Sequence, residues 1–123
     1  MKHSAQEIRA ALNAQTGTFH YWRVFPFKGA PVVTDGVKEM IDLCEAYWLV
    51  ADITAYQAEE KIRKEEFQVW RLVCGQNDTA VLICEDGNGH VLMKEDIAYT
   101  DFPLPEGVTL YLDNGVLLLP GEY

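Results

Sequence analysis

The sequence predicts an α+β domain, in which an antiparallel sheet packs against helices. Three observations predict this class. Apolar residues recur at helical spacing from residue 34 to 62. From residue 66 the pattern changes to a period of two, and the last apolar run, at 116–119, shows no alternation. Clusters of glycine, asparagine and aspartate separate the alternating runs. The chain has 123 residues, a length typical of a single domain, so we expect one domain over 1–123.

Residues 1–15 predict a short helical extension that packs on the central helical segment. Ser4 is suited to cap a helix that begins at Ala5, and Glu7 completes the pattern of a capping box. Gly17 is expected to stop this helix. Residues 18–25 are rich in aromatic and β-branched side chains and predict an N-terminal strand, followed by a loop. Its position in the sheet is not fixed by the sequence.

The segment 34–62 gives the strongest helical pattern, and Thr34 or Asp35 can cap its start. Between residues 46 and 57 the segment is apolar nearly all round. We expect one central helix buried on two sides, and the alternative is a break near Glu45 and Ala46 into two helices. The residues that share the main apolar stripe are Val37, Met40, Ile41, Cys44, Trp48, Ala51, Ala55, Ala58 and Ile62.

The remainder of the chain, residues 66–119, predicts a meander of about five strands. Asn114 and Gly115 stand between the last two apolar runs, which is a strong hairpin signal. The acidic turn at 85–89 does not match a calcium-binding loop, because position six and position twelve of such a loop would be apolar residues. The strands are expected at 67–74, 79–85, 90–97, 108–112 and 116–119.

Charge and composition exclude several classes of function. The chain carries 19 acidic and ten basic residues, a net charge of −9. Residues 1–34 carry +3, so the rest carries −12. Such a chain is not expected to bind DNA or RNA directly, since that binding depends on lysine and arginine. No apolar run is long enough to cross a membrane, and we expect a cytoplasmic protein.

The reactive residue types do not form a catalytic motif. Ser4 is the only serine, which nearly excludes a serine triad. Cys44, Cys74 and Cys84 show no metal-binding spacing, and we expect them to be reduced and mostly buried. We therefore expect no cofactor, no metal and no enzymatic activity.

Asp52 is the most informative single residue, because a carboxylate on an apolar helix must be paired, protonated or at the mouth of a pocket. A structural hydrogen-bond network is the plainer interpretation. The alternative is a small-molecule-binding or enzymatic pocket formed around Asp52 and the strand that contains the basic and aromatic cluster at 20–23. That candidate pocket contains His20, Trp22, Arg23, Tyr47, Asp52 and Tyr56.

The acidic clusters are either an ordinary solvated face or a surface that docks on a basic partner. Proteins that imitate DNA use the second arrangement. The candidate partner-binding residues are Asp35, Glu39, Asp42, Glu85, Asp86, Asp96 and Asp101.

Several short runs of residues occur here in the same order as in a known family. Through these runs the chain resembles a family of small bacterial proteins, a domain of unknown function that is often carried by phages, plasmids and integrated elements. The resemblance covers about residue 16 to the end. It departs before Thr16, where the first helix resembles an added piece, and between Arg23 and Thr34, where the loop differs. It implies an accessory protein of a mobile element, and small acidic inhibitors of host defence, anti-CRISPR-like proteins among them, are one candidate class in that context. The runs are Thr16–Thr18, Thr34–Lys38, Ala46–Leu49 with Asp52, Glu66–Trp70, Tyr99–Leu104, Asn114–Pro120 and Glu122–Tyr123.

Together these observations predict a non-enzymatic acidic interaction protein of a phage or mobile element. Its expected partner is a host or phage protein with a basic surface, which it would bind in place of nucleic acid. A homodimer formed through a second apolar helical face is a further possibility.

Overall fold

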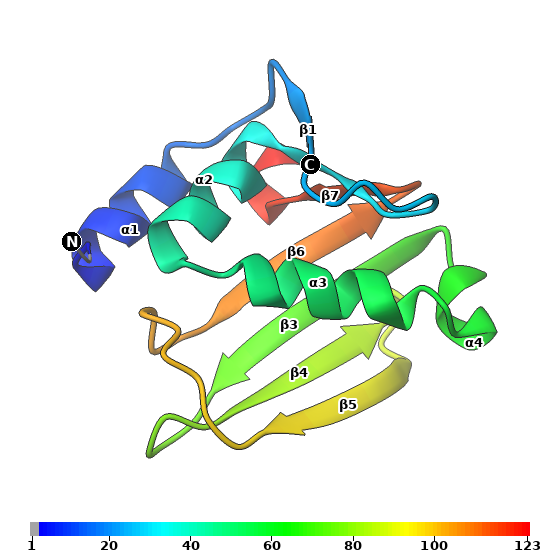
Figure 1. The fold of residues 1–123 in the computed structure, drawn as a ribbon. Coiled ribbons are helices and arrows are strands. Elements are labelled where there is room, and N and C mark those ends of the chain that lie inside the picture. The colour runs from blue at the N-terminus through cyan, green and yellow to red at the C-terminus, as the bar shows by residue number, and fades with distance from the viewer. Residues whose placement is uncertain (1–2) are drawn as a thin grey trace.

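A computed structural model describes residues 3–123 and shows one seven-stranded sheet with helices packed against it (Figure 1). The strand order is β1-β2-β7-β6-β3-β4-β5, so β1 and β5 form the two edges. The elements are α1 (Ala5–Asn13), β1 (Tyr21–Arg23), β2 (Val32–Thr34), α2 (Asp35–Cys44), α3 (Tyr47–Tyr56), α4 (Glu60–Arg63), β3 (Phe67–Cys74), β4 (Ala80–Glu85), β5 (Val91–Ile97), β6 (Val108–Asp113), β7 (Val116–Leu118) and the short 3-10 helix η1 (Pro120–Glu122).

The first helix forms as its capping residues predict. The Ser4 hydroxyl accepts a hydrogen bond from Glu7 N at 3.1 Å, and Ser4 N donates to Glu7 Oε1 at 3.2 Å. This reciprocal pair satisfies two backbone donors that a helix start otherwise leaves open. Ile8 is fully buried, and α1 packs against α2, as expected for the N-terminal helix.

The helical segment is broken, which corrects the expectation of one central helix. Glu45 adopts a left-handed conformation with φ of 53°, and it ends α2 where the alternative interpretation placed the break. The reversal allows α2 and α3 to bury different faces, so Met40 and Ile41 of α2 and Leu49 and Ile53 of α3 all reach the core. A glycine usually occupies a left-handed helix end. Its absence here explains why the sequence did not favour the break.

The N-terminal strand is shorter than predicted, and a second short strand was missed. Only 21–23 of the expected 18–25 pair as β1, and all three residues are exposed. β2 follows the loop and runs parallel to β7, with Val32 opposite Val116 and Val33 opposite Leu117. This pairing places β1 at the edge of the sheet beyond β2.

The predicted C-terminal strands form within one or two residues of their expected bounds. β3, β4 and β5 form an antiparallel meander, and β6 and β7 form a hairpin. β6 pairs with β3 instead of β5, so the connection after β5 crosses the end of the sheet (Figure 1). Asn114 and Gly115 both have positive φ, as a two-residue hairpin turn requires.

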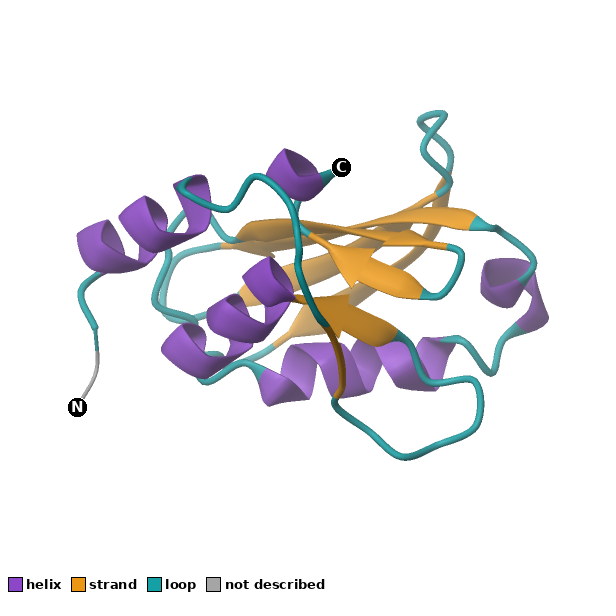
Figure 2. Ribbon diagram, turned by 90° about the horizontal axis from the view of Figure 1, so that it is seen from above, coloured by secondary structure: helices purple, strands orange, loops and turns teal. Residues whose placement is uncertain are grey.

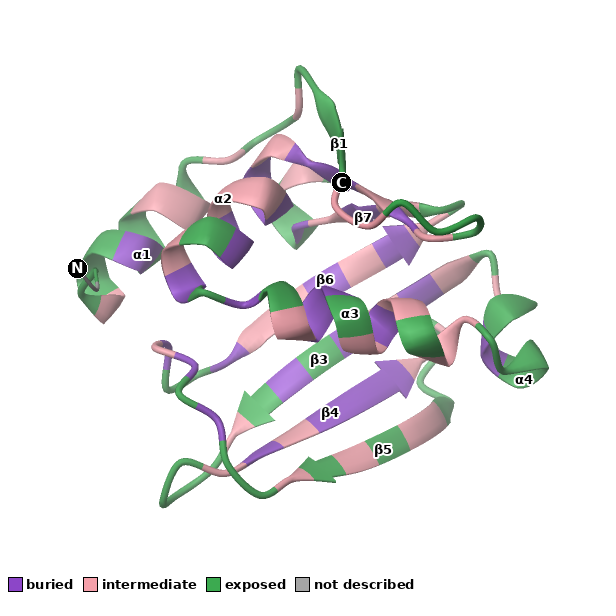
Figure 3. Ribbon diagram, in the orientation of Figure 1, coloured by how far each residue is buried: buried purple, intermediate pink, exposed green. Residues whose placement is uncertain are grey.

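The core lies between one face of the sheet and helices α2 and α3. Figure 2 shows these helices on one side of the sheet, and Figure 3 shows buried positions along β3, β4 and β6 under α3. Trp70, Leu82 and Leu110 point into this core and are essentially inaccessible. On the other face, Tyr123 packs edge-on against Phe67 and Tyr111, with ring centroids 5.5 Å apart in each pair. No helix in residues 3–123 has the length and apolar character needed to cross a membrane.

Candidate functional site

Asp35 is used inside the structure to hold the β1 segment on α2. Its carboxylate accepts hydrogen bonds from Phe19 N at 2.8 Å, from Trp22 Nε1 at 2.8 Å and from His20 N at 3.3 Å. Backbone and indole donors favour the ionised form, so they lower the pKa of Asp35 below its ordinary value. Asp35 is therefore an anchor for the edge of the sheet as well as a surface charge.

Asp42 joins the end of α2 to the start of α3. It accepts hydrogen bonds from Lys38 Nζ at 2.6 Å and from the Tyr47 hydroxyl at 2.7 Å. Burial opposes ionisation of Asp42, but these two donors outweigh it and lower the pKa of Asp42. Lys38 Nζ also lies 5.4 Å from the ring centre of Trp22, which is a cation–π distance. Trp22 and Tyr47 thus belong to one cluster at the surface of α2.

Asp52 and Tyr56 lie at another place, on the side of α3 that faces the edge strand β5. The Tyr56 hydroxyl donates to Glu95 Oε1 at 2.8 Å, and this bond is the main reason that the pKa of Tyr56 rises to about 12. Partial burial and the charge of Glu95 raise the pKa of Asp52 above its ordinary value. Glu59 adds a third negative charge near Tyr56. We call Asp52, Glu59 and Glu95 the acidic triad.

The residues of the predicted Asp52 pocket therefore fall into two groups. His20, Trp22 and Arg23 lie on or beside β1, and Tyr47 joins them through Asp42 and Lys38. Asp52 and Tyr56 face β5, at the opposite edge of the sheet. One pocket does not contain all of these side chains.

The other predicted partner-binding carboxylates are also distributed over the surface. Glu39 accepts from Gln15 Nε2 at 2.5 Å, and Glu85 pairs with Arg71 at 3.0 Å on the face of the sheet away from the helices. Asp86 accepts from Asn88 N at 2.8 Å and lies 2.9 Å from the His90 ring, so it stabilises the β4–β5 turn. Asp96 and Asp101 are exposed.

The three cysteines are free thiols in the structure, as predicted. Cys44 and Cys84 are buried, and burial raises the pKa of Cys44 to about 11 and that of Cys84 to about 12. Thiols with such pKa values hold their protons near neutral pH and are poor nucleophiles. In residues 3–123, no group of three or more histidine, cysteine, aspartate or glutamate side chains is arranged to hold a metal ion.

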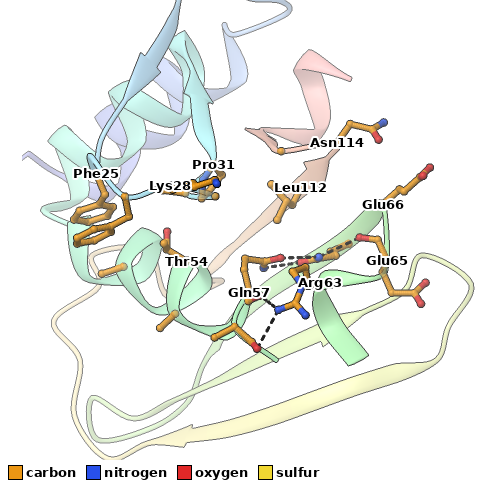
Figure 4. A pocket seen from close by; sticks show the side chains of 18 residues that line it. Phe25, Lys28, Pro31, Thr54, Gln57, Arg63, Glu65, Glu66, Leu112 and Asn114 are labelled. Atoms are coloured by element: carbon orange, nitrogen blue, oxygen red, sulfur yellow. Dashed lines mark hydrogen bonds between the residues drawn. The ribbon is translucent and has the colours of Figure 1, made fainter. Parts of the chain in front are cut away.

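A cavity of about 720 Å³ lies between α3 and the loop that connects β1 to β2, and sequence reasoning did not predict it. Figure 4 shows Phe25, Lys28 and Pro31 of this loop on one side, and Thr54 of α3, Gln57 directly after it and Arg63 on the other. Leu112 of β6 and Asn114 of the last turn complete the wall near the sheet.

A pair of glutamines forms the floor of this cavity. Gln57 Nε2 donates to Gln68 Oε1 at 2.9 Å, and Gln68 Nε2 donates back to Gln57 Oε1 at 3.0 Å. Gln68 is 1% exposed and also accepts from Trp70 Nε1 at 2.9 Å. A polar side chain at an inward position of an apolar strand is the one feature of the sequence that could have indicated this cavity.

The chain matches a known family model over nearly its whole length. The model of a family of unknown function (DUF6876) matches residues 6–123. The chain belongs to this family. The match begins at residue 6, so most of α1 is part of the family's domain, which corrects the expectation of an added piece before Thr16. Comparisons with the curated proteins and with the solved structures give no match to the chain.

Proposed function

We propose that this protein is a non-enzymatic acidic interaction protein, and that the acidic triad around Tyr56 contacts a basic surface of its partner. The observation that carries the proposal is the unbalanced charge at this place. Asp52 and Glu59 form no ion pair within the described residues, and Glu95 bonds only to the neutral hydroxyl of Tyr56. An arginine or lysine from a partner would supply the missing countercharge.

The neutralised carboxylates lie elsewhere on the molecule. Glu106 forms a double hydrogen bond with Arg9, Asp42 pairs with Lys38, and Glu85 pairs with Arg71. These pairs use Arg9, Lys38 and Arg71 for contacts inside the molecule. Like charges that remain together weaken the folded state slightly, so an arrangement that keeps them together is better explained by binding than by stability.

The position beside β5 also suits contact with a protein. β5 is an edge strand, so one side of its backbone has no partner strand within the sheet. Lys94 and Asp96 alternate with Glu95 along it and discourage self-association through this edge. A partner that approaches β5 meets both the acidic triad and these backbone groups.

We propose further that the partner is a host or phage protein whose basic surface normally binds nucleic acid. The net charge of −9 and the resemblance to proteins of phages and mobile elements support this form. Occupation of such a surface by carboxylates would inhibit the partner, as in anti-defence proteins. Asp101, which is exposed in the loop after β5, is suited to extend the contact from the acidic triad. Asp96 is also exposed, on the opposite face of β5 from Glu95, and would contact a partner that covers the edge of the sheet.

The test is affinity capture from the lysate of a bacterial host with three forms of the protein. They are the wild type, the neutralised variant Asp52→Asn/Glu59→Gln/Glu95→Gln, and the control variant Asp78→Asn, which removes one exposed charge in the β3–β4 turn. We expect a protein that is retained at low salt by the wild type and the control, lost by the neutralised variant, and released as salt screens the contact.

Circular dichroism must show that all three forms are folded. A partner retained equally by the neutralised variant would contradict the assignment to the acidic triad. Capture that is insensitive to salt would contradict electrostatic docking as a whole.

A further inference from the structure

The cavity between α3 and the β1–β2 loop has the size and lining of a small-molecule site. Its volume of about 720 Å³ lies in the range of roughly 300–1,000 Å³ that is typical of ligand pockets. It shares no lining residue with the acidic triad, so an inference about it is independent of the proposed protein partner.

The walls of the cavity suit a flat apolar group. The rings of Phe25 and Phe27 are stacked, with centroids 6.0 Å apart and planes 9° apart. The facing side of α3 presents Ala51 and Ala55, whose small side chains leave the space between helix and loop open. Phe27 is 60% exposed, and its ring is accessible to a ligand that enters this space.

The polar groups of the floor are already satisfied. The amide N–H groups of Gln57 and Gln68 donate to each other and to backbone carbonyls, including Ile53 O and Ile62 O. The Thr54 hydroxyl donates to Val50 O at 2.7 Å. These groups have no hydrogen left to donate to a ligand. Their hydrogen bonds to each other and to the backbone fix the shape of the floor.

The two cations of the lining still have donors that a ligand can use. Arg63 Nη1 donates to Gln57 O at 3.2 Å and to Ala58 O at 3.1 Å, which holds the guanidinium at the end of α3. Within residues 3–123, neither Arg63 Nη2 nor Lys28 Nζ makes a hydrogen bond or ion pair. Glu65 and Glu66 also line the cavity, but their carboxylates point away from Phe25 and Lys28 (Figure 4).

We propose that this cavity binds a small aromatic anion. The ring of the ligand lies between Phe27 and the alanine side of α3, and its acidic group lies between Lys28 and Arg63. Stacking on the phenylalanine and burial of the ring supply affinity, and charge-assisted hydrogen bonds to the two cations select for the anion.

The experiment measures binding of three probes by isothermal titration calorimetry, with amide chemical shifts to locate the site. Naphthalene-2-sulfonate carries the ring and the charge, naphthalene-2-sulfonamide carries the ring alone, and methanesulfonate carries the charge alone. We expect the sulfonate to bind at one site and to bind at least about tenfold more tightly than either other probe. The shifts should change at residues 25–31 and 51–58.

Two kinds of variant test the assignment. Ala55→Phe fills the cavity and should abolish sulfonate binding, whereas Ala10→Phe, on the exposed side of α1, should not. Lys28→Met should weaken the sulfonate by about tenfold and leave the sulfonamide unchanged, whereas Lys64→Met, outside the cavity, should change neither. Arg63→Met should likewise weaken binding of the sulfonate and leave binding of the sulfonamide unchanged. If the loss of Arg63 destabilises α4, Lys28→Met still tests the proposal, because Lys28 lies in the loop.

The absence of sulfonate binding would overturn the proposal. Equal affinity for the sulfonate and the sulfonamide would show that the cations do not recognise the ligand and would overturn it as well. Binding that survives Ala55→Phe would place the ligand outside this cavity.

Discussion

Glu122 Oε1 accepts a hydrogen bond from the Thr34 hydroxyl at 2.6 Å, and this contact connects the C-terminal segment to the start of α2. The same carboxylate accepts from Gly36 N at 3.1 Å and from Leu119 N at 3.0 Å. A carboxylate at the N-terminus of a helix is favourable because it meets unpaired amides and the positive end of the helix dipole. Glu122 therefore stabilises two segments that are distant in the sequence.

The close contact between Gly36 and Glu122 predicts a non-additive pair of substitutions. A Cβ at Gly36 would lie 2.5 Å from Glu122 Oε1, so Gly36→Ala must displace the carboxylate. We expect Gly36→Ala to destabilise the wild type and to stabilise the Glu122→Ala background by up to about 1 kcal/mol, the helix preference of alanine over glycine. Urea denaturation of the four forms measures this coupling. Additive free energies would contradict it.

Gln68 is predicted to be the most sensitive polar residue in the core. In Gln68→Met, the Trp70 indole and the Gln57 amide lose partners in a buried place. We expect the free energy of unfolding to fall by about 3 kcal/mol, since each unpaired buried group costs roughly 1–3 kcal/mol. Chemical denaturation measures the loss, and Gln76→Met in the exposed β3–β4 turn is the matched control. A loss as small as that of the control would show that the glutamine pair is dispensable.

Asp35 is predicted to control the attachment of β1. Asp35→Ala removes the acceptor for Phe19 N and Trp22 Nε1, so amide hydrogen exchange at residues 19–23 should accelerate while the core stays protected. The pKa of Asp35 is lowered in the folded state, so its contribution is present above the ordinary value of 3.8 and is lost as pH falls through the folded pKa. Trp22 fluorescence, taken as the difference from Trp22→Phe, should follow this loss. Unchanged exchange in Asp35→Ala would refute the role.

Asp52 is predicted to have the opposite pH dependence. Its pKa is raised in the folded state, so the stability linked to its protonation is full below the unfolded value of 3.8 and is lost as pH rises through the folded pKa. Asp52→Asn should therefore be more stable than the wild type at neutral pH, and this difference should vanish below about pH 3. Thermal unfolding across pH measures it, with Asp101→Asn as the control for an exposed loop carboxylate. Equal pH profiles for the wild type and Asp52→Asn would contradict the prediction.

Glu95 is predicted to delay the ionisation of Tyr56. The hydrogen bond and the negative charge raise the pKa of Tyr56 to about 12. In Glu95→Gln the charge is removed, so one additional tyrosine should ionise by about pH 11, where the wild type keeps it protonated. Phenolate absorbance in the near ultraviolet measures this change. The signal must be absent in Glu95→Gln/Tyr56→Phe, and its persistence there would assign it to another tyrosine.

The strands after residue 66 were predictable because each is a short apolar or alternating run bounded by turn residues. Phe67–Cys74 forms at its predicted bounds for this reason. β2 was not predictable, because it contains three residues and exists through its pairing with β7, far along the chain. The break after α2 was recognised only as the alternative to one helix, since Glu45 carries no sequence signal for a left-handed conformation.

The candidate site was predictable only in part. Asp52 was recognised because a carboxylate is unusual within an apolar helix, but its neighbour Glu95 comes from a distant strand. The cavity depends on where the β1–β2 loop packs, and that position follows from the pairing of β2 with β7. Local patterns contain no information on such long-range contacts.

The parallel pairing of β2 with β7 also constrains how the chain folds during synthesis. About 80 residues separate the two strands, so their association must wait until the intervening segment has left the ribosome. Until then, Val33 and the face of α2 that it helps to cover remain without their final neighbours. We expect nascent chains that end before β7 to be recognised by chaperones through this uncovered apolar surface, and chains that include it to be released.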